Sequence, residues 1–253
     1  MHFLSMLSGL LLTGFNNMAV LILTAYVFSR TRVYEDIMAR KFTVWNMSWL
    51  VGVMGVLSIW GTVSGVDVLG NIANIRNLGP IIAGFVAGPL AGVLAGLIGG
   101  VHRYFMGGDS RLPCSIVTVL AGFFAGIVYL ANGKKFVGIK KAVIFAAGIE
   151  VFHSAMVLLL YGVHEPAFFA NFMADFDMAW EIEKATTLPR VLVVALGVGV
   201  FAFIIDNLVR ERKVKEENKR TEYELKGARE IQMNIVPKNL HLISQFFLIF
   251  LYT

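Results

Sequence analysis

Charged residues are scarce in this sequence. Only 15% of its 253 residues are Asp, Glu, Lys or Arg, whereas about a quarter is usual in a soluble domain. In contrast, 57% are hydrophobic, and the mean hydropathy is +0.71. A soluble fold of this composition would lack the polar side chains that cover a surface in water. We therefore expect a chain that is solvated by a lipid bilayer.

Several chemical motifs are also missing. Cys114 is the single cysteine, which excludes an internal disulfide and a paired-cysteine metal motif. The sequence has no Walker loop, no Gly-x-Ser-x-Gly motif and no His-Glu-x-x-His motif. Its N-terminus has neither a basic region nor a cleavage site, so we expect segment 7–29 to be a retained helix. We expect no cofactor, no metal site and no enzyme activity in the chain as given.

The positive charge lies beside the apolar segments. The net charge is +5 and the pI about 9.3, but the basic residues cluster in short loops and one tail. This pattern is typical of anchoring at an anionic inner leaflet, and we expect no nucleic-acid partner.

Six apolar segments recur along the chain, at residues 7–29, 42–65, 78–101, 112–131, 142–163 and 188–209. Each can cross roughly 30 Å of hydrocarbon as a helix, and a helix satisfies its own backbone in lipid. The predicted fold class is an all-α integral membrane bundle. It has five to six transmembrane helices, a broken Gly/Pro-rich segment and a cytoplasmic signalling helix.

The distribution of Lys and Arg among the loops predicts which side of the membrane each loop faces. The basic tail after residue 209 and the 132–141 loop are expected inside, and the acidic 164–187 loop outside. Three arginines and Lys41 also place the 30–41 loop inside, yet six crossings would put it outside. Either segment 78–101 is a re-entrant hairpin broken at Gly88-Pro89, or one loop violates the rule.

Glycines recur every fourth residue in this segment and would form one smooth helix face for close packing: Gly84, Gly88, Gly92, Gly96 and Gly100.

Two arginines flank the glycine-rich segment. Arg76 precedes it and Arg103 follows it, and in a hairpin both would reach the same outer face. Arginine suits bidentate carboxylate binding, and Cys114 and Ser115 open the next helix nearby. A small carboxylate ligand held by these residues is one interpretation. The other is that both arginines extend to lipid headgroups.

Glu150 and His153 lie within an apolar segment at i, i+3 spacing, which places them on one helix face. They are expected to pair with each other or with a buried arginine; a proton relay is the alternative.

The tail predicts a signalling helix. Residues 211–232 are charged and favour a helix, with a weak heptad seam at Val214, Asn218, Thr221, Leu225, Ala228, Gln232 and Ile235. The seam favours a parallel homodimeric coiled coil; the alternative is a solvated amphipathic helix. The expected domains are a membrane sensor at 1–209, a coiled-coil linker at 210–236 and a truncated output-domain start at 237–253.

Residues 5–210 resemble the LytS-type transmembrane receptor region. The matching motifs are Gly-Thr-x-x-Gly, Asn-x-Arg, Ala-Gly-x-x-x-Gly-Pro, His-Arg-Tyr before Gly-Gly, and a cysteine. Here they are Gly61, Thr62 and Gly65; Asn74 and Arg76; Ala83, Gly84, Gly88 and Pro89; His102, Arg103, Tyr104, Gly107 and Gly108; and Cys114. Val117 stands where the family often has a serine.

The resemblance implies a multi-pass sensor of the bacterial inner membrane with a cytoplasmic C-terminus, tied to cell-wall or metabolite signalling. It also implies a small carboxylate ligand at the arginine and cysteine positions. The predicted ligand-binding residues are therefore Arg76, Arg103 and Cys114, with Ser115 and Asn74 beside them. Sensor kinases of this type continue with a phosphorylated histidine after a proline, but Lys238 follows Pro237 here. The preceding helix resembles the entry to a SpoIIE-type phosphatase domain, so the expected output is a kinase or a phosphatase.

Two other functions remain open. Broken glycine-rich helices beside a polar site are also typical of small-solute transporters or their substrate-binding subunits, although a transporter does not need the heptad seam. The unusual sequence 239–253 is also consistent with a truncated product that has no function.

Overall fold

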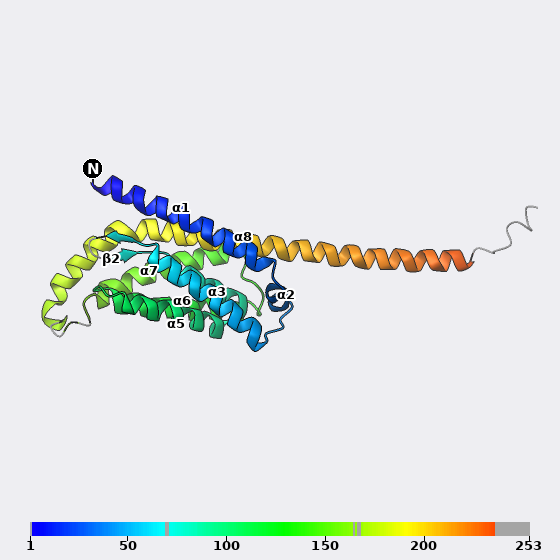
Figure 1. The fold of residues 1–253 in the computed structure, drawn as a ribbon, viewed down its shortest axis with the longest axis horizontal. Coiled ribbons are helices and arrows are strands. Elements are labelled where there is room, and N and C mark those ends of the chain that lie inside the picture. The colour runs from blue at the N-terminus through cyan, green and yellow to red at the C-terminus, as the bar shows by residue number, and fades with distance from the viewer. Residues whose placement is uncertain (1, 69–70, 164, 166–167, 236–253) are drawn as a thin grey trace, which may run out of the picture. The chain divides into compact units, whose positions relative to one another are not determined.

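The computed structural model describes residues 2–68, 71–163, 165 and 168–235 (Figure 1). The helices found there are α1 (His2–Ser29), α2 (Arg32–Met38), α3 (Val44–Val63), α4 (Leu78–Ala87), α5 (Pro89–Phe105), α6 (Arg111–Ala131), α7 (Ile139–Leu160) and α8 (Phe168–Ile235). The predicted all-α membrane fold is confirmed. The prediction lacked one element, an antiparallel pair of short strands, β1 (Val66–Val68) and β2 (Asn71–Ala73), in which Val66 lies opposite Ala73.

Four helices are long and apolar enough to cross a membrane by length and composition. Within the described residues these stretches are Val44–Val63, Arg111–Ala131, Ile139–Leu160 and Asn171–Met233. The apolar stretches Ala19–Ser29 in α1 and Leu78–Ala87 in α4 are shorter. Thr43 caps the start of α3, since its side chain accepts a hydrogen bond from the Asn46 backbone nitrogen at 3.2 Å.

The break predicted at Gly88-Pro89 is present. Gly88 has a φ of 89°, a conformation that favours glycine, and Pro89 is the first residue of α5. Thr118 of α6 contacts Asn77 at the start of α4, and its carbonyl lies against Gly96 in α5. The two helices therefore form a hairpin, since both return to the same level of α6.

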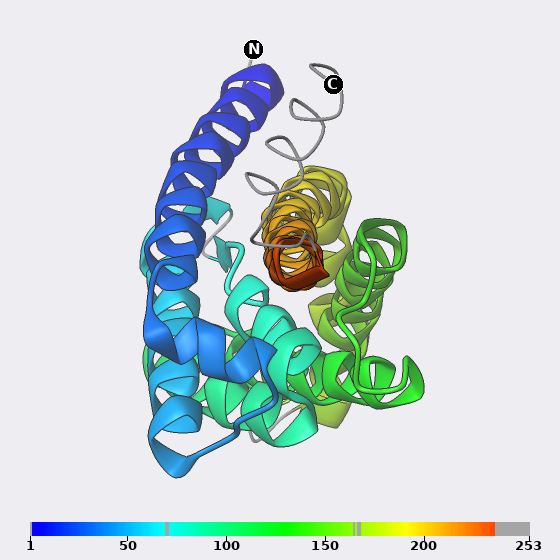
Figure 2. The same cartoon turned by 90° about the vertical axis from the view of Figure 1, so that its right-hand side faces the viewer.

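The hairpin bears on the predicted number of crossings. Ile98 of α5 packs on Gly55 of α3, and Gly99 packs on Ser58, so α3 runs parallel to α5 and antiparallel to α6. The 30–43 connection and the 132–138 connection consequently lie at one end of the bundle (Figures 1 and 2). This arrangement supports five crossings by α1, α3, α6, α7 and α8, with a re-entrant α4–α5 hairpin.

The glycine prediction also agrees with the packing. A side chain on Gly92 would collide with the backbone of Gly122, and one on Gly84 would meet the Gly122 carbonyl oxygen at 2.5 Å. Glycine permits this close approach of α4 and α5 to α6.

The predicted loop at 164–187 is wrong for most of its length, because residues 168–187 belong to α8. Its acidic residues suggested a loop, but this part of the helix has a buried face with Ala179, Ile182, Glu183 and Thr186. Pro189 lies within the helix.

The chain divides into two compact units between Asp206 and Asn207. In the second unit, the predicted helical tail is confirmed through Ile235. Its surface carries i, i+4 ion pairs, Arg220–Glu224 at 2.9 Å and Lys226–Glu222 at 2.8 Å. The predicted output-domain start lies at 237–253, outside the described residues.

Candidate functional site

Among the described residues of the first unit, five charged side chains are buried, in addition to His153. Arg76 and Arg103 are each 1% exposed, Glu150 is fully buried, and Glu183 and Arg190 are 4% and 8% exposed. Buried charges at membrane depth are costly and are found mainly where function or pairing requires them. These residues therefore define the candidate site.

Arg190 holds both glutamates. Its Nε lies 2.8 Å from Glu150 on α7. Its Nη2 lies 2.8 Å from Glu183, which precedes it by seven residues on α8. Ser154 accepts a further bond from Arg190 at 2.7 Å. The guanidinium thus bonds to two carboxylates at once and links α7 to α8.

The predicted Glu150–His153 pair is present. His153 Nδ1 lies 3.4 Å from Glu150, and its Nε2 lies 3.3 Å from both Arg76 Nη2 and Cys114 Sγ. Because a guanidinium only donates, Nε2 accepts from Arg76, and the geometry fits a neutral ring with its proton on Nδ1. The pair is a bridge between the sites of Arg76 and Arg190.

Arg76 is held by neutral partners. Its Nε donates to Thr118 at 2.9 Å, and its backbone nitrogen donates to the Asn74 side chain at 3.4 Å. Its Nη1 has no hydrogen-bond partner within the described residues. A buried donor without a partner is expensive, so an acceptor placed beside Nη1 would be favourable.

Arg103 lies at the end of α5. It donates to the Gly107 carbonyl and to Ser110 at 3.0 Å, and its Nε has no partner in the described part of the chain. Burial of both Arg76 and Arg103 inside the protein argues against the alternative in which they extend to headgroups.

A cavity of about 20 Å³ lies between the polar groups. Its walls include Asn74, Ser110, Cys114, His153, Glu183 and Arg190. A single water needs roughly 10–15 Å³, so the cavity holds about one water. Arg76 and Arg103 do not line it directly; they bond to His153 and Ser110 of its wall.

Ser115, a predicted ligand-binding residue, does not line this cavity. Its hydroxyl donates to the Arg111 carbonyl at 2.7 Å, and its own carbonyl lies near Gly100 of α5. Asn77, whose side chain donates to Glu150 at 2.8 Å, joins the site instead.

Sequence reasoning missed Glu183 and Arg190. Glu183 was counted among the acidic residues of an outer loop, and Arg190 stood at the edge of the predicted final span. The signal for Arg190 was available, since a charge immediately after Pro189 within an apolar helix is unusual.

A multi-pass bundle with a buried, arginine-rich polar site and an extended C-terminal helix is the architecture of a membrane receptor module. Residues 31–208 match a family model described as "5TMR of 5TMR-LYT". The chain belongs to this family, a membrane-embedded receptor region of signal-transduction proteins.

Curated relatives of the chain are sensor proteins. The chain is similar to the "Sensor protein LytS" of Bacillus subtilis, with 23% identity over 202 residues, 79% of this chain and 30% of that protein. It is similar to the "Sensor histidine kinase BtsS" of Escherichia coli, with 31% identity over 121 residues, 48% of this chain and 22% of that protein. The "Sensor histidine kinase/phosphatase LytS" of Staphylococcus aureus is 25% identical over 218 residues, 78% of this chain and 35% of that protein.

The chain therefore spans about a third or less of the length of these relatives. No solved structure matches it.

Proposed function

We propose that this chain is the sensing module of a bacterial inner-membrane receptor that binds a small carboxylate and signals through α8. The excess of buried positive charge supports the carboxylate ligand. The described buried residues hold three arginines and two glutamates, and both glutamates pair with Arg190. Arg76 and Arg103 have no carboxylate partner there, so an anionic ligand would balance the site.

The small size of the cavity suggests how binding becomes a signal. A carboxylate larger than one water would have to separate the contacts among α6, α7 and α8. Such a ligand prefers an expanded packing state and shifts the population toward it. Because α8 carries Glu183 and Arg190 and continues to Ile235, its displacement would reach the tail.

The output belongs to the whole protein. By analogy with the relatives, we infer a cytoplasmic kinase or phosphatase domain after α8, a homodimer joined through the 210–236 linker and a cytoplasmic C-terminus. The chain as given is proposed to sense without catalysing a reaction.

A thermal-shift screen of the detergent-purified chain against small carboxylates tests the ligand. We expect one or more acids to raise the melting temperature, and Arg76→Gln or Arg103→Gln to abolish the shift. Arg220→Gln, on the exposed tail, is the control and should leave the shift unchanged. A stabilising acid that acts equally on all three variants would refute the site.

The α4–α5 hairpin favours a second candidate, a small-solute transporter, because broken helices beside a polar site occur in transporters. Uptake of the stabilising acid into proteoliposomes would support this candidate; tight binding without uptake supports the receptor.

A further inference from the structure

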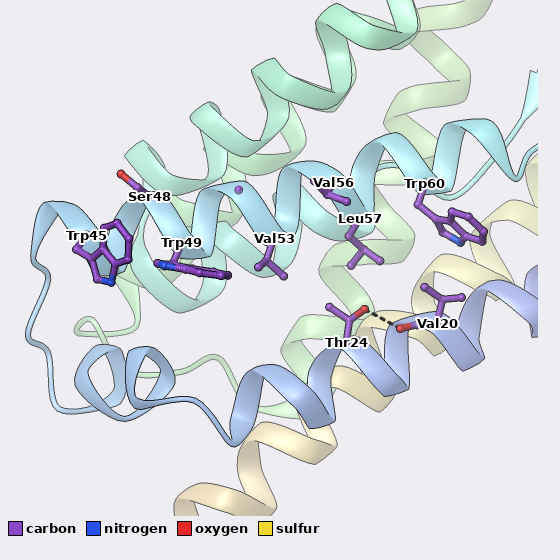
Figure 3. A pocket seen from close by; sticks show the side chains of 10 residues that line it. Val20, Thr24, Trp45, Ser48, Trp49, Val53, Val56, Leu57 and Trp60 are labelled. Atoms are coloured by element: carbon purple, nitrogen blue, oxygen red, sulfur yellow. Dashed lines mark hydrogen bonds between the residues drawn. The ribbon is translucent and has the colours of Figure 1, made fainter.

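A second cavity, whose lining shares no residue with the polar site, lies between α1 and α3. One part, about 570 Å³, is lined by residues that include Val20, Trp45, Val56 and Trp60, and Figure 3 shows them along both helices. An adjoining part of about 500 Å³ shares Thr24, Trp49 and Val53 with the first. We call the continuous hollow the α1–α3 groove; each part is as large as a typical ligand pocket.

The walls of the groove offer hydrocarbon and aromatic rings. The Thr24 hydroxyl donates to the Val20 carbonyl at 2.8 Å, so it is already satisfied within α1 (Figure 3). Trp60 Nε1 donates to Asn17 at 3.1 Å and joins the two helices at one end. Gly52 faces open space, with no atom within 4 Å of the position where its Cβ would lie. An apolar chain fits these walls.

Tryptophan is concentrated there. Three of the four tryptophans of the sequence, Trp45, Trp49 and Trp60, line the groove. Trp45 and Trp49 pack edge-to-face with ring centroids 6.2 Å apart. Trp45 lies at the start of α3, and tryptophans at helix ends mark the level of lipid headgroups.

The same end of the groove is basic. Residues 30–41 contain four exposed basic residues, Arg30, Arg32, Arg40 and Lys41, against Glu35 and Asp36, a balance of +2. The groove reaches Thr31 and Val33, which are the chain neighbours of Arg30 and Arg32. Arg30 also lies over the Tyr26 ring at 5.2 Å. An apolar slot therefore opens at a cationic mouth.

We propose that the α1–α3 groove binds an anionic phospholipid of the surrounding bilayer. An acyl chain lies between Trp60 and Trp49, and the headgroup phosphate contacts the basic segment 30–41. The combination of one apolar channel and one positive mouth matches an amphiphile with a single anionic head. A neutral apolar helix from a second copy would gain nothing from the four cations.

Lipid binding can be measured by the fluorescence of the tryptophans in the groove. In a Trp180→Phe variant, the three remaining tryptophans all line the groove. The detergent-purified protein would be titrated with phosphatidylglycerol or phosphatidylcholine that carries bromine on its acyl chains, which quenches nearby indole fluorescence. We expect phosphatidylglycerol to quench at a lower mole fraction than phosphatidylcholine, with saturation.

Two matched pairs of variants locate the binding. Gly52→Leu fills the groove without a clash, whereas Gly148→Leu places the same side chain on α7, where the structure also has nothing within 4 Å. Only Gly52→Leu should remove the preference for phosphatidylglycerol. Arg30→Gln with Arg32→Gln should weaken it by roughly fivefold per charge, whereas Lys134→Gln with Lys135→Gln, in another basic loop, should not.

Equal quenching by the two lipids would overturn the proposal, as would the same titration curve for Gly52→Leu and Gly148→Leu. Absence of quenching by both lipids, with a dimer in solution that Gly52→Leu disrupts, would assign the groove to a second copy and also overturn it.

Discussion

Arg190 of α8 lies 2.8 Å from Glu150 of α7 in the interior of the bundle. The same guanidinium binds Glu183 at 2.8 Å, so one residue pairs with two buried carboxylates on two helices. This relationship distinguishes Arg190 from the other two buried arginines, because Arg76 and Arg103 have no carboxylate partner among the described residues. In the proposed function, an anionic ligand binds those two.

Arg190→Ala should destabilise the protein strongly, because it leaves two carboxylates buried without a cation. Removal of one partner of a buried ion pair costs roughly 3–5 kcal/mol. Thermal unfolding of the purified variant in detergent would measure the effect. Arg220→Ala removes an exposed ion pair from the tail and should change the melting temperature very little. Similar melting temperatures for both variants would show that Arg190 does not carry the network.

Close packing of α5 on α6 gives a second expectation. Gly92→Ala places a methyl group against the backbone of Gly122, and overpacking of this kind costs about 1–3 kcal/mol. Gly148→Ala is the matched control, because its methyl group meets nothing within 4 Å. Alanine also favours a helix over glycine by about 1 kcal/mol. The control should thus be neutral or more stable in the same unfolding assay, and a stable Gly92→Ala would contradict the packing.

The sequence predicted those features of the fold that are local. Apolar runs located the helices that cross, and Gly88-Pro89 located the break in the hairpin, because glycine and proline restrict the backbone where they stand. The positive residues of 30–41 left two interpretations open, a re-entrant hairpin or six crossings with one loop that violates the rule. By contrast, residues 168–187 were assigned to a loop because of their acidic residues. The burial of Glu183 on a helix could not be foreseen, since it depends on the partner Arg190.

The candidate site was partly predictable for the same reason. Arg76, Arg103 and Cys114 were found as unusual residues beside apolar segments and by resemblance to the family. Asn77 and Arg190 were not, because their importance comes from contacts with Glu150, which is 73 and 40 residues away in the sequence. The α1–α3 groove was equally hidden, since the separation of two helices has no local signal.

Cysteine labelling can distinguish five membrane crossings from six. With a re-entrant hairpin, Lys41→Cys and Lys135→Cys react with a membrane-impermeant maleimide from the same side, because their loops lie at one end of the bundle. Six crossings would put them on opposite sides. Both variants are made with Cys114→Ala, which removes the single native thiol, and are compared in intact cells and inverted vesicles. Met106→Cys, at the other end of the bundle, should label from the opposite side.

Cysteine cross-linking in the tail of α8 tests the proposed dimer. Val214 and Leu225, two apolar members of the heptad seam, are 54% and 65% exposed in the single chain, as expected for a face that lacks its partner. With Cys114→Ala as background, Leu225→Cys should form a disulfide-linked dimer under mild oxidation in membranes. Tyr223→Cys, two residues away and outside the seam, should cross-link much less. Because the seam brings position 225 of two parallel helices together and directs position 223 outward, equal cross-linking of both variants would indicate random collision between tails and would remove the support for a coiled coil.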